Sequence, residues 1–322
     1  MKQRSREALY VERLPRLDLL TVRERLLPFC RLKRGEVWED KERGHRIGVL
    51  DATSPFETAR LFGSTKVDCF INDPPYNFAV GGKASKNLFK MELKAYLEFS
   101  ERWVQNALNA ANPDCHFYVW LGMDVKNNFQ PLPDFMLLMR QFKKLKPRNF
   151  ITWRKQRGYG TQHNWMWLRQ ELLHYICGRP FFRVVYTEIP KVLKGYYKTV
   201  GGRLTENLER SRAATIRPGN VWIDIQQVFY RLEENMPGCY AQKPLKAITR
   251  LLEASTQPGQ VVADLFAHAG TTLIAGELLG RRVLTADIDE VFAELTIRRL
   301  LHLRATGKTG FQWASPFPEL DS

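Results

Sequence analysis

The sequence predicts an α/β protein in which helices cover both faces of a mostly parallel, doubly wound sheet. Two observations predict this class. Short apolar runs alternate along the chain with amphipathic segments, which is the pattern of strand–helix–strand units. In addition, 44% of the 322 residues are hydrophobic, so the chain can bury one large core with an insertion, or two smaller cores.

The expected strands are the apolar runs, in chain order 45–50, 67–71, 116–121, 149–153, 172–177, 260–266 and 281–288. The expected helices lie between them, and two begin at or just after a proline, whose fixed φ suits a first turn. These helices span 56–62, 93–111, 245–255, 271–279 and 290–303.

The formal charge of +15 favours a polyanionic partner, because basic side chains displace counterions from nucleic acids. The excess is concentrated between Phe135 and Gln170, where no acidic residue occurs. The basic residues of this stretch are Arg140, Lys143, Lys144, Lys146, Arg148, Arg154, Lys155, Arg157 and Arg169. Such a run without a carboxylate predicts a nucleic-acid track rather than a mixed-charge solvated face.

The cysteines are odd in number and far apart, which indicates neither a zinc site nor a disulfide framework. We expect reduced, mostly buried thiols in a cytoplasmic protein, and no metal. The amino terminus lacks the apolar core of a signal peptide, and no run approaches membrane-spanning length. We therefore expect no membrane role.

Two loops carry the chemical signals. The strand at 67–71 ends in NDPPYNF, where neither proline can donate a ladder hydrogen bond, so rigid carbonyls lie beside a carboxylate and a ring. The second loop, ADLFAHAGTT at 263–272, follows a buried strand and opens a helix whose amino terminus favours a negatively charged ligand group. Asp287 follows about twenty residues on, the spacing of a carboxylate that binds ribose hydroxyls. The second loop and Asp287 predict a nucleoside pocket.

Together these motifs resemble those of the amino-group DNA methyltransferases that use S-adenosylmethionine, whose signatures are D-P-P-Y and F-x-G-x-G followed by T-T. This chain has DPPY at 73–76 and FAHAGTT at 266–272, in the order of the β group of that family. GVLDA at 48–52, NVWIDI at 220–225 and YAQKPL at 240–245 are further similarities. The resemblance covers 32–303 and implies a class I, Rossmann-like methyltransferase fold.

The resemblance also implies roles for individual residues. Target-base residues would be Asp73, Pro74, Pro75 and Tyr76. Cofactor residues would be Asp287 at the ribose, Asp51 at the adenine amino group, Lys243, and in the loop Asp264, Phe266, Ala267, His268, Gly270, Thr271 and Thr272. His268 replaces a glycine of the signature, and we expect its side chain to point outward. Asp289 is expected to cap the following helix.

The chemistry explains why an acid should precede a proline here. An exocyclic base amine is a poor nucleophile because its lone pair is delocalised into the ring. If Asp73 and the Pro74 carbonyl each accept one N–H, they hold the nitrogen closer to tetrahedral and stabilise developing positive charge. Tyr76 would stack on the base, which must first leave the duplex. Phe78 is either a second wall of that pocket or a core residue.

The resemblance and the charge together imply double-stranded DNA as partner. Expected DNA contacts are Lys143, Lys144, Lys146, Arg148, Arg154, Lys155 and Arg157 in the basic stretch, and Arg183, Arg203, Arg210 and Arg212 in an irregular insert. The insert should read the target sequence, and its aromatics should form a small core. Residues 79–90 are expected to cover the substrate. A homodimer and a cognate restriction endonuclease are further possibilities of the family.

The expected division is an amino-terminal extension at 1–44 that packs as helix on the main domain or on a partner, a catalytic half at 45–178, the target-recognition insert at 179–235, a cofactor half at 236–304 and a tail at 305–322. Asp at the first motif position favours adenine N6 over cytosine N4. The alternatives are an RNA-base enzyme, disfavoured by motif order, and a catalytically silent DNA-binding protein. A glutamine methyltransferase would need N-P-P-Y, and a nicotinamide oxidoreductase would need a glycine-rich first turn.

Overall fold

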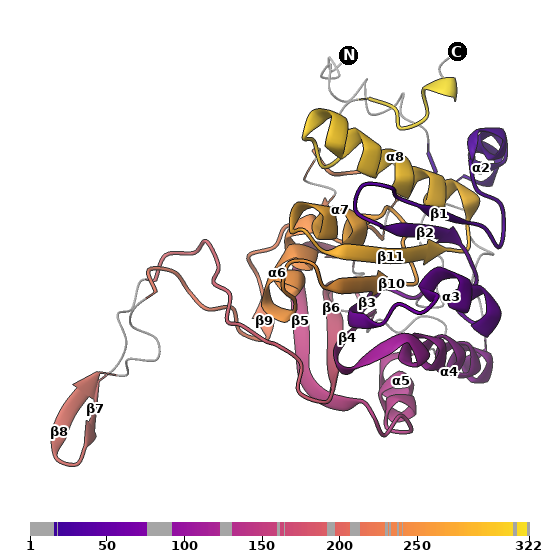
Figure 1. The fold of residues 1–322 in the computed structure, drawn as a ribbon. Coiled ribbons are helices and arrows are strands. Elements are labelled where there is room, and N and C mark those ends of the chain that lie inside the picture. Colours follow the sequence, from indigo (N-terminus) through magenta and orange to yellow (C-terminus); the bar gives the residue numbers. More distant parts are fainter. Residues whose placement is uncertain are drawn as a thin grey trace, which may run out of the picture.

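In the computed structural model, the described residues are 16–17, 19–75, 92–122, 131–159, 162–163, 165–191, 197–206, 213–228, 231, 233–236, 238–239, 241–311 and 314–320. They form a nine-stranded sheet and a separate two-stranded hairpin (Figure 1). The large sheet has the order β1-β2-β11-β10-β3-β4-β6-β5-β9. The chain passes from β3 to β4 in one direction and from β10 to β11 in the other, so the sheet winds outward from the β10–β3 pair.

The strands of the large sheet are β1 (Val37–Glu39), β2 (Arg46–Val49), β3 (Val67–Asn72), β4 (Ala111–Leu121), β5 (Lys146–Tyr159), β6 (Trp167–Cys177), β9 (Val221–Trp222), β10 (Val261–Asp264) and β11 (Arg282–Asp287). Neighbours are parallel from β2 through β11, β10 and β3 to β4, whereas β6 is antiparallel to both β4 and β5. The predicted mostly parallel sheet is confirmed, and each predicted strand is present.

The helices are α2 (Leu20–Leu26), η1 (Leu27–Phe29), α3 (Pro55–Phe62), α4 (Leu93–Ala110), α5 (Pro131–Met139), α6 (Leu245–Ser255), α7 (Thr271–Leu278), α8 (Glu290–Thr306) and η5 (Pro318–Leu320). Helix α4 contacts both α3 and α5 on one face of the sheet, and α7 contacts both α6 and α8 on the other (Figure 1). The predicted helices are confirmed. Across the described residues, no helix is both long and apolar enough to cross a membrane.

The described part of the amino-terminal extension packs on the main domain through α2. Leu26 of α2 joins a small second core with Val291 and Leu295 of α8 and with Phe317 near the carboxyl terminus. The extension also contributes β1, which pairs antiparallel with β2 and was not predicted. The five cysteines were predicted to be buried and reduced, and all are buried and free.

The described residues of the insert do not form the small aromatic core that the sequence predicts. Among its described aromatic residues, Phe181, Phe182 and Tyr186 are 38%, 52% and 50% exposed. Trp222 and Ile225, farther along the insert, belong instead to the main core. The hairpin of β7 (Tyr197–Val200) and β8 (Arg203–Glu206) lies well away from the body of the molecule (Figure 1). The described insert is therefore an arm whose return strand joins the large sheet.

Candidate active site

Four carboxylates follow four neighbouring strands at one edge of the sheet. Asp51 follows β2, Asp287 ends β11, Asp264 ends β10 and Asp73 follows β3. These strands are parallel, so all four side chains belong to the carboxyl edge. The β10–β3 pair is where the winding of the sheet reverses, and ligands of open α/β sheets bind at such a point.

The end of β3 is tied to the turn after β10. Asn72 is buried, and its Oδ1 accepts the Leu265 N–H at 3.1 Å. Asp73 comes next and forms an ion pair with Lys243, whose side chain is only 6% exposed. The Lys243 ammonium also donates to the Ala241 carbonyl at 3.3 Å. The sequence assigned Lys243 to the cofactor, and the structure places it on the Asp73 carboxylate.

Trp120, near the end of β4, lies beside this ion pair. The Lys243 ammonium is 5.5 Å from the centre of the Trp120 ring, within range of a cation–π interaction. The indole Nε1 is buried and has no hydrogen-bond partner among the described residues. Trp120 is not among the residues that the sequence predicts for the site, although its place at the end of an apolar strand is a usable signal.

The turn after β10 is organised by Asp264, which is 5% exposed. Its carboxylate accepts the Phe266 N–H at 2.9 Å and the Thr272 hydroxyl at 2.6 Å. Burial raises the pKa of Asp264 to about 7. Gly270 has φ of 71°, and a Cβ there would lie 2.9 Å from the Thr296 side chain. The turn therefore requires glycine at 270 and brings the backbone close to α8 where α7 begins.

His268 has φ of 45°, the left-handed region that side chains rarely adopt. Its ring lies 4.7 Å from that of Phe292, and the half-buried residue is part of the wall of a cavity. Burial, followed by the charge of Lys243, lowers the pKa of His268 to about 4. The imidazole is thus neutral at physiological pH. The Phe292 contact offers the side chain a place to pack.

The two outer carboxylates differ in their surroundings. Asp287 accepts the His268 N–H at 2.8 Å and the Asp289 N–H at 3.0 Å, and burial and Asp289 raise its pKa to about 7. Asp51 accepts the Thr53 N–H and hydroxyl, each at 2.8 Å, and lies 3.4 Å from Arg34. Asp289 caps α8 by accepting the Val291 N–H at 2.9 Å, as predicted.

One small cavity joins the two predicted motifs. Its wall includes Asp73, Trp120, Lys243, Asp264, Phe266, Ala267, His268, Thr271 and Thr272. Asp51, Asp287, Gly270 and Pro74 lie outside that wall, and Asp287 is linked to it through His268. Pro74 is buried and Pro75 is half-buried directly after Asp73. Tyr76, Phe78 and the segment 79–90 lie outside the described residues.

The basic stretch occupies both edges of the sheet rather than one track. Lys143 and Lys144 precede β5, and Lys146 and Arg148 begin it, beside the amino-terminal part of β4. Arg154, Lys155 and Arg157 lie farther along β5, beyond the end of β4. Among the described residues, only the second set is at the edge that carries Asp73.

The insert arginines are also separated. Arg183 donates from its guanidinium to the Glu253 carbonyl at 2.6 Å, so it caps the last turn of α6. Arg203 lies in β8 of the projecting hairpin, and Arg210 and Arg212 lie outside the described residues.

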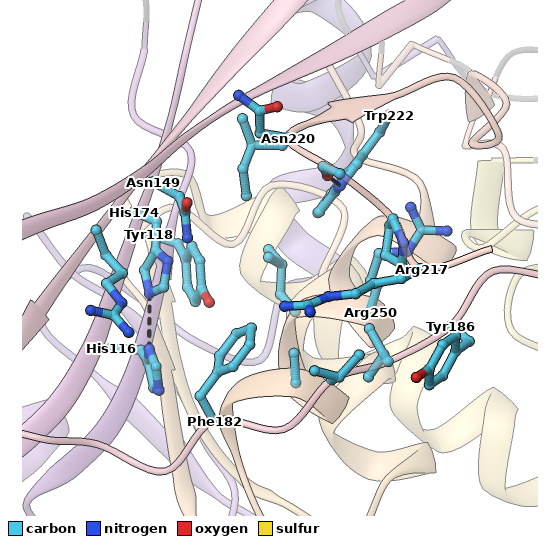
Figure 2. A pocket seen from close by; sticks show the side chains of 18 of the residues that line it. His116, Tyr118, Asn149, His174, Phe182, Tyr186, Arg217, Asn220, Trp222 and Arg250 are labelled. Carbon is cyan, nitrogen blue, oxygen red and sulfur yellow. Dashed lines mark hydrogen bonds between the residues drawn. The ribbon is translucent and has the colours of Figure 1, made fainter. Parts of the chain in front are cut away.

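A second, larger cavity of about 1420 Å³ lies between β4, β6, α6 and the arm (Figure 2). His116 and His174 contact each other in it through Nδ1 and Nε2 at 2.9 Å, and Arg217 and Arg250 face it from the other side (Figure 2). Its described lining contains no carboxylate. None of the predicted cofactor residues lines it, so it is separate from the site at Asp73.

A family model described as DNA methylase, of the N6/N4 type, matches residues 67–298. Type II methyltransferase M.HpaI of Haemophilus parainfluenzae is 26% identical over 252 residues, which are 78% of this chain and 73% of that protein. The PvuII cytosine-N4-specific DNA methyltransferase superposes with a TM-score of 0.55 at 13% identity, over 83% of this chain and 89% of that one. The crystal structure of the M1.HpyAVI–SAM complex superposes with a TM-score of 0.50 at 17% identity, over 79% of this chain and 98% of that one.

Proposed function

This chain belongs to the DNA methylase family of the N6/N4 type, and we propose that it transfers a methyl group from S-adenosylmethionine to the exocyclic N6 of an adenine in duplex DNA. One observation carries the proposal. Asp73 and the Asp264–Thr272 turn come from motifs far apart in the sequence and face the same cavity at the point where the sheet reverses.

The residues at this edge suit a nucleoside cofactor that bears a positive charge. An ionised carboxylate can accept about four hydrogen bonds, and Asp287 accepts those of the His268, Asp289 and Ile288 N–H groups, so it has capacity left for a ribose hydroxyl. Asp264 and the start of α7 are assigned to the methionine part, and Asp51 to the adenine amino group. When bound, S-adenosylmethionine supplies an electrophilic methyl group on a sulfonium.

Asp73 and the Pro74 carbonyl are assigned to the target amine. The carboxylate accepts one N–H and the carbonyl the other, which frees the nitrogen lone pair and stabilises charge that develops on it. The two prolines fix the backbone, so the acceptors are preorganised. Lys243 holds the Asp73 carboxylate at the cavity before the base arrives. We assign Lys243 a positioning role that the sequence did not indicate.

Adenine is proposed because Asp occupies the first position of the motif. The test is incubation of unmethylated DNA with enzyme and cofactor, digestion to nucleosides and mass spectrometry. We expect N6-methyladenine. N4-methylcytosine would overturn the base assignment alone, and DNA binding without any modified base would support the silent DNA-binding alternative. A homodimer and a cognate endonuclease stay predictions.

A further inference from the structure

Strands β5 and β6 form a hairpin that extends past the rest of the sheet. The last residue of β4, Leu121, pairs with Glu171 of β6, and Glu171 pairs with Thr152 of β5. The two strands are paired as far as Arg154 and Arg169, and they pair again at Tyr159 and Trp167 after a shift in register on β5. Among the described residues, neither strand has another strand beside it at this distal end. At about 3.3 Å per residue along β6, the paired part of this overhang is roughly 13 Å long.

The overhang is on the same edge as Asp73. Strand β3 pairs with β4 so that Asn72 lies beside Val119, two residues before the end of β4. Two strand spacings of about 4.8 Å separate β3 from β6, so the far end of the hairpin lies about 20 Å from Asp73. That is too far to stack on a base held at Asp73, and near enough to contact the duplex beside it.

The distal part of the hairpin exposes large apolar side chains. Trp165 is 89% exposed, Met166 is 55% exposed and Trp167 is 37% exposed. Gly158 is needed for the pairing, since a Cβ there would lie 2.1 Å from the Trp167 carbonyl oxygen. A tryptophan this exposed beside a paired, glycine-dependent position indicates a contact surface rather than a displaced core residue.

Charge identifies the partner. The overhang carries Arg154, Lys155 and Arg169, of which Arg169 is ion-paired with Glu171 at the base of the overhang. The stretch between Phe135 and Gln170 contains no acid. A basic surface with exposed apolar side chains is complementary to duplex DNA, whose phosphates bind the cations and whose base edges, including the thymine methyl group, contact apolar side chains. The major groove of B-DNA admits a two-stranded β-ribbon.

We propose that the β5–β6 overhang enters the major groove next to the target base, with Trp165 against base edges and Arg154 on a flanking phosphate. This inference rests on the proposed function. It assigns the contacts that recognise the DNA sequence to the β5–β6 hairpin. The arm, which the sequence predicts to read the target, leaves β6 at the opposite edge: its Arg179 N–H binds Asp114, near the start of β4. In this arrangement the arm contributes DNA affinity that does not depend on the base sequence.

The test compares Trp165→Ala with Phe56→Ala, a matched control because Phe56 is 72% exposed on α3. The duplex carries the site identified by sequencing DNA that the wild-type enzyme has methylated. Trp165→Ala should weaken binding of this duplex roughly 10- to 100-fold and leave the salt dependence unchanged. Arg154→Gln should instead lower the slope of log Kd against log salt by about 1. Cofactor affinity should stay within about twofold of wild type for both.

The inference is overturned if Trp165→Ala binds and methylates like Phe56→Ala, or if it alters only self-association in sedimentation. It is also overturned if removing 197–206 changes the methylated sequence while Trp165→Ala does not. A wild-type protein that binds cofactor and methylates no DNA would instead refute the proposed function, so the two failures are distinguishable.

Discussion

At the scale of single residues, the ion pair between Asp73 and Lys243 sets the character of the site. Lys243 is almost fully buried, and a buried cation needs its partner because desolvation costs several kcal/mol. The pair therefore fixes the carboxylate in the cavity. A charge held in place before the substrate arrives reduces the reorganisation needed during reaction.

Lys243→Met should lower kcat about 10- to 100-fold, because Asp73 loses the group that orients it. Cofactor Kd, measured by calorimetry, should stay within about threefold of wild type. Lys243→Arg, which can still pair with a carboxylate, should recover part of the rate. A large rise in cofactor Kd with unchanged kcat would return Lys243 to the cofactor side, where the sequence placed it.

Asp264 gives a prediction about pH and stability. Its pKa is raised by burial to about 7, above the unfolded value, so the folded state holds the proton more tightly between about pH 4 and 7. The free energy of unfolding should therefore fall as pH rises through that range. In urea unfolding without cofactor, Asp264→Asn should be more stable than wild type by about 1 to 3 kcal/mol near pH 8, and not near pH 4.5. Equal effects at both pH values would contradict this.

At the scale of elements, the turn from β10 into α7 depends on Gly270 for two reasons, its φ of 71° and its closeness to Thr296 of α8. Gly307 has φ of 73°, and a Cβ added there would have no other atom within 4 Å, so it isolates the backbone effect. The comparison separates strain from crowding.

Gly307→Ala should cost about 1 kcal/mol of unfolding free energy, and Gly270→Ala about 2 to 4 kcal/mol. The double variant Gly270→Ala/Thr296→Ala should recover part of the difference, because the crowded atoms are gone. Thermal unfolding provides the measurement. An equal loss of unfolding free energy for the two variants would mean that α8 shifts to make room for the Cβ added at residue 270.

The elements themselves were largely predictable, because buried strands and amphipathic helices each leave a local periodicity in the sequence. The extent of β5 was not predicted, because the segment 154–159 is mostly polar and has no alternating apolar pattern. Helix α5 was also missed, since Pro131 and Pro133 suggest a break, although both fit in a first turn.

At the scale of the whole molecule, the two edges of the sheet carry different parts of the protein. Its carboxyl edge holds the candidate active site and the β5–β6 overhang, and its amino edge holds the root of the arm. The four carboxylates could be placed at one edge from motif order and the parallel sheet alone. The Asp73–Lys243 pair could not, because 170 residues separate its members and no local pattern links them.

The net charge of +15 predicts strongly salt-dependent DNA binding. Each phosphate contact releases counterions, so Kd should rise at least about 10-fold between about 50 and 200 mM salt. Fluorescence anisotropy with a short duplex measures this. Binding that does not change with salt would show that the basic residues of both edges stay in solvent.

The central claim is that Asp73 accepts a hydrogen bond from the target amine, and Asp73→Ala tests it most directly. Methyl transfer to DNA should fall at least about 100-fold, while the Kd values for duplex and cofactor stay within a few-fold of wild type. The variant Asp73→Ala/Lys243→Met, which leaves no unpaired ammonium, should be as inactive. Substantial methyl transfer by either folded variant would contradict the claim.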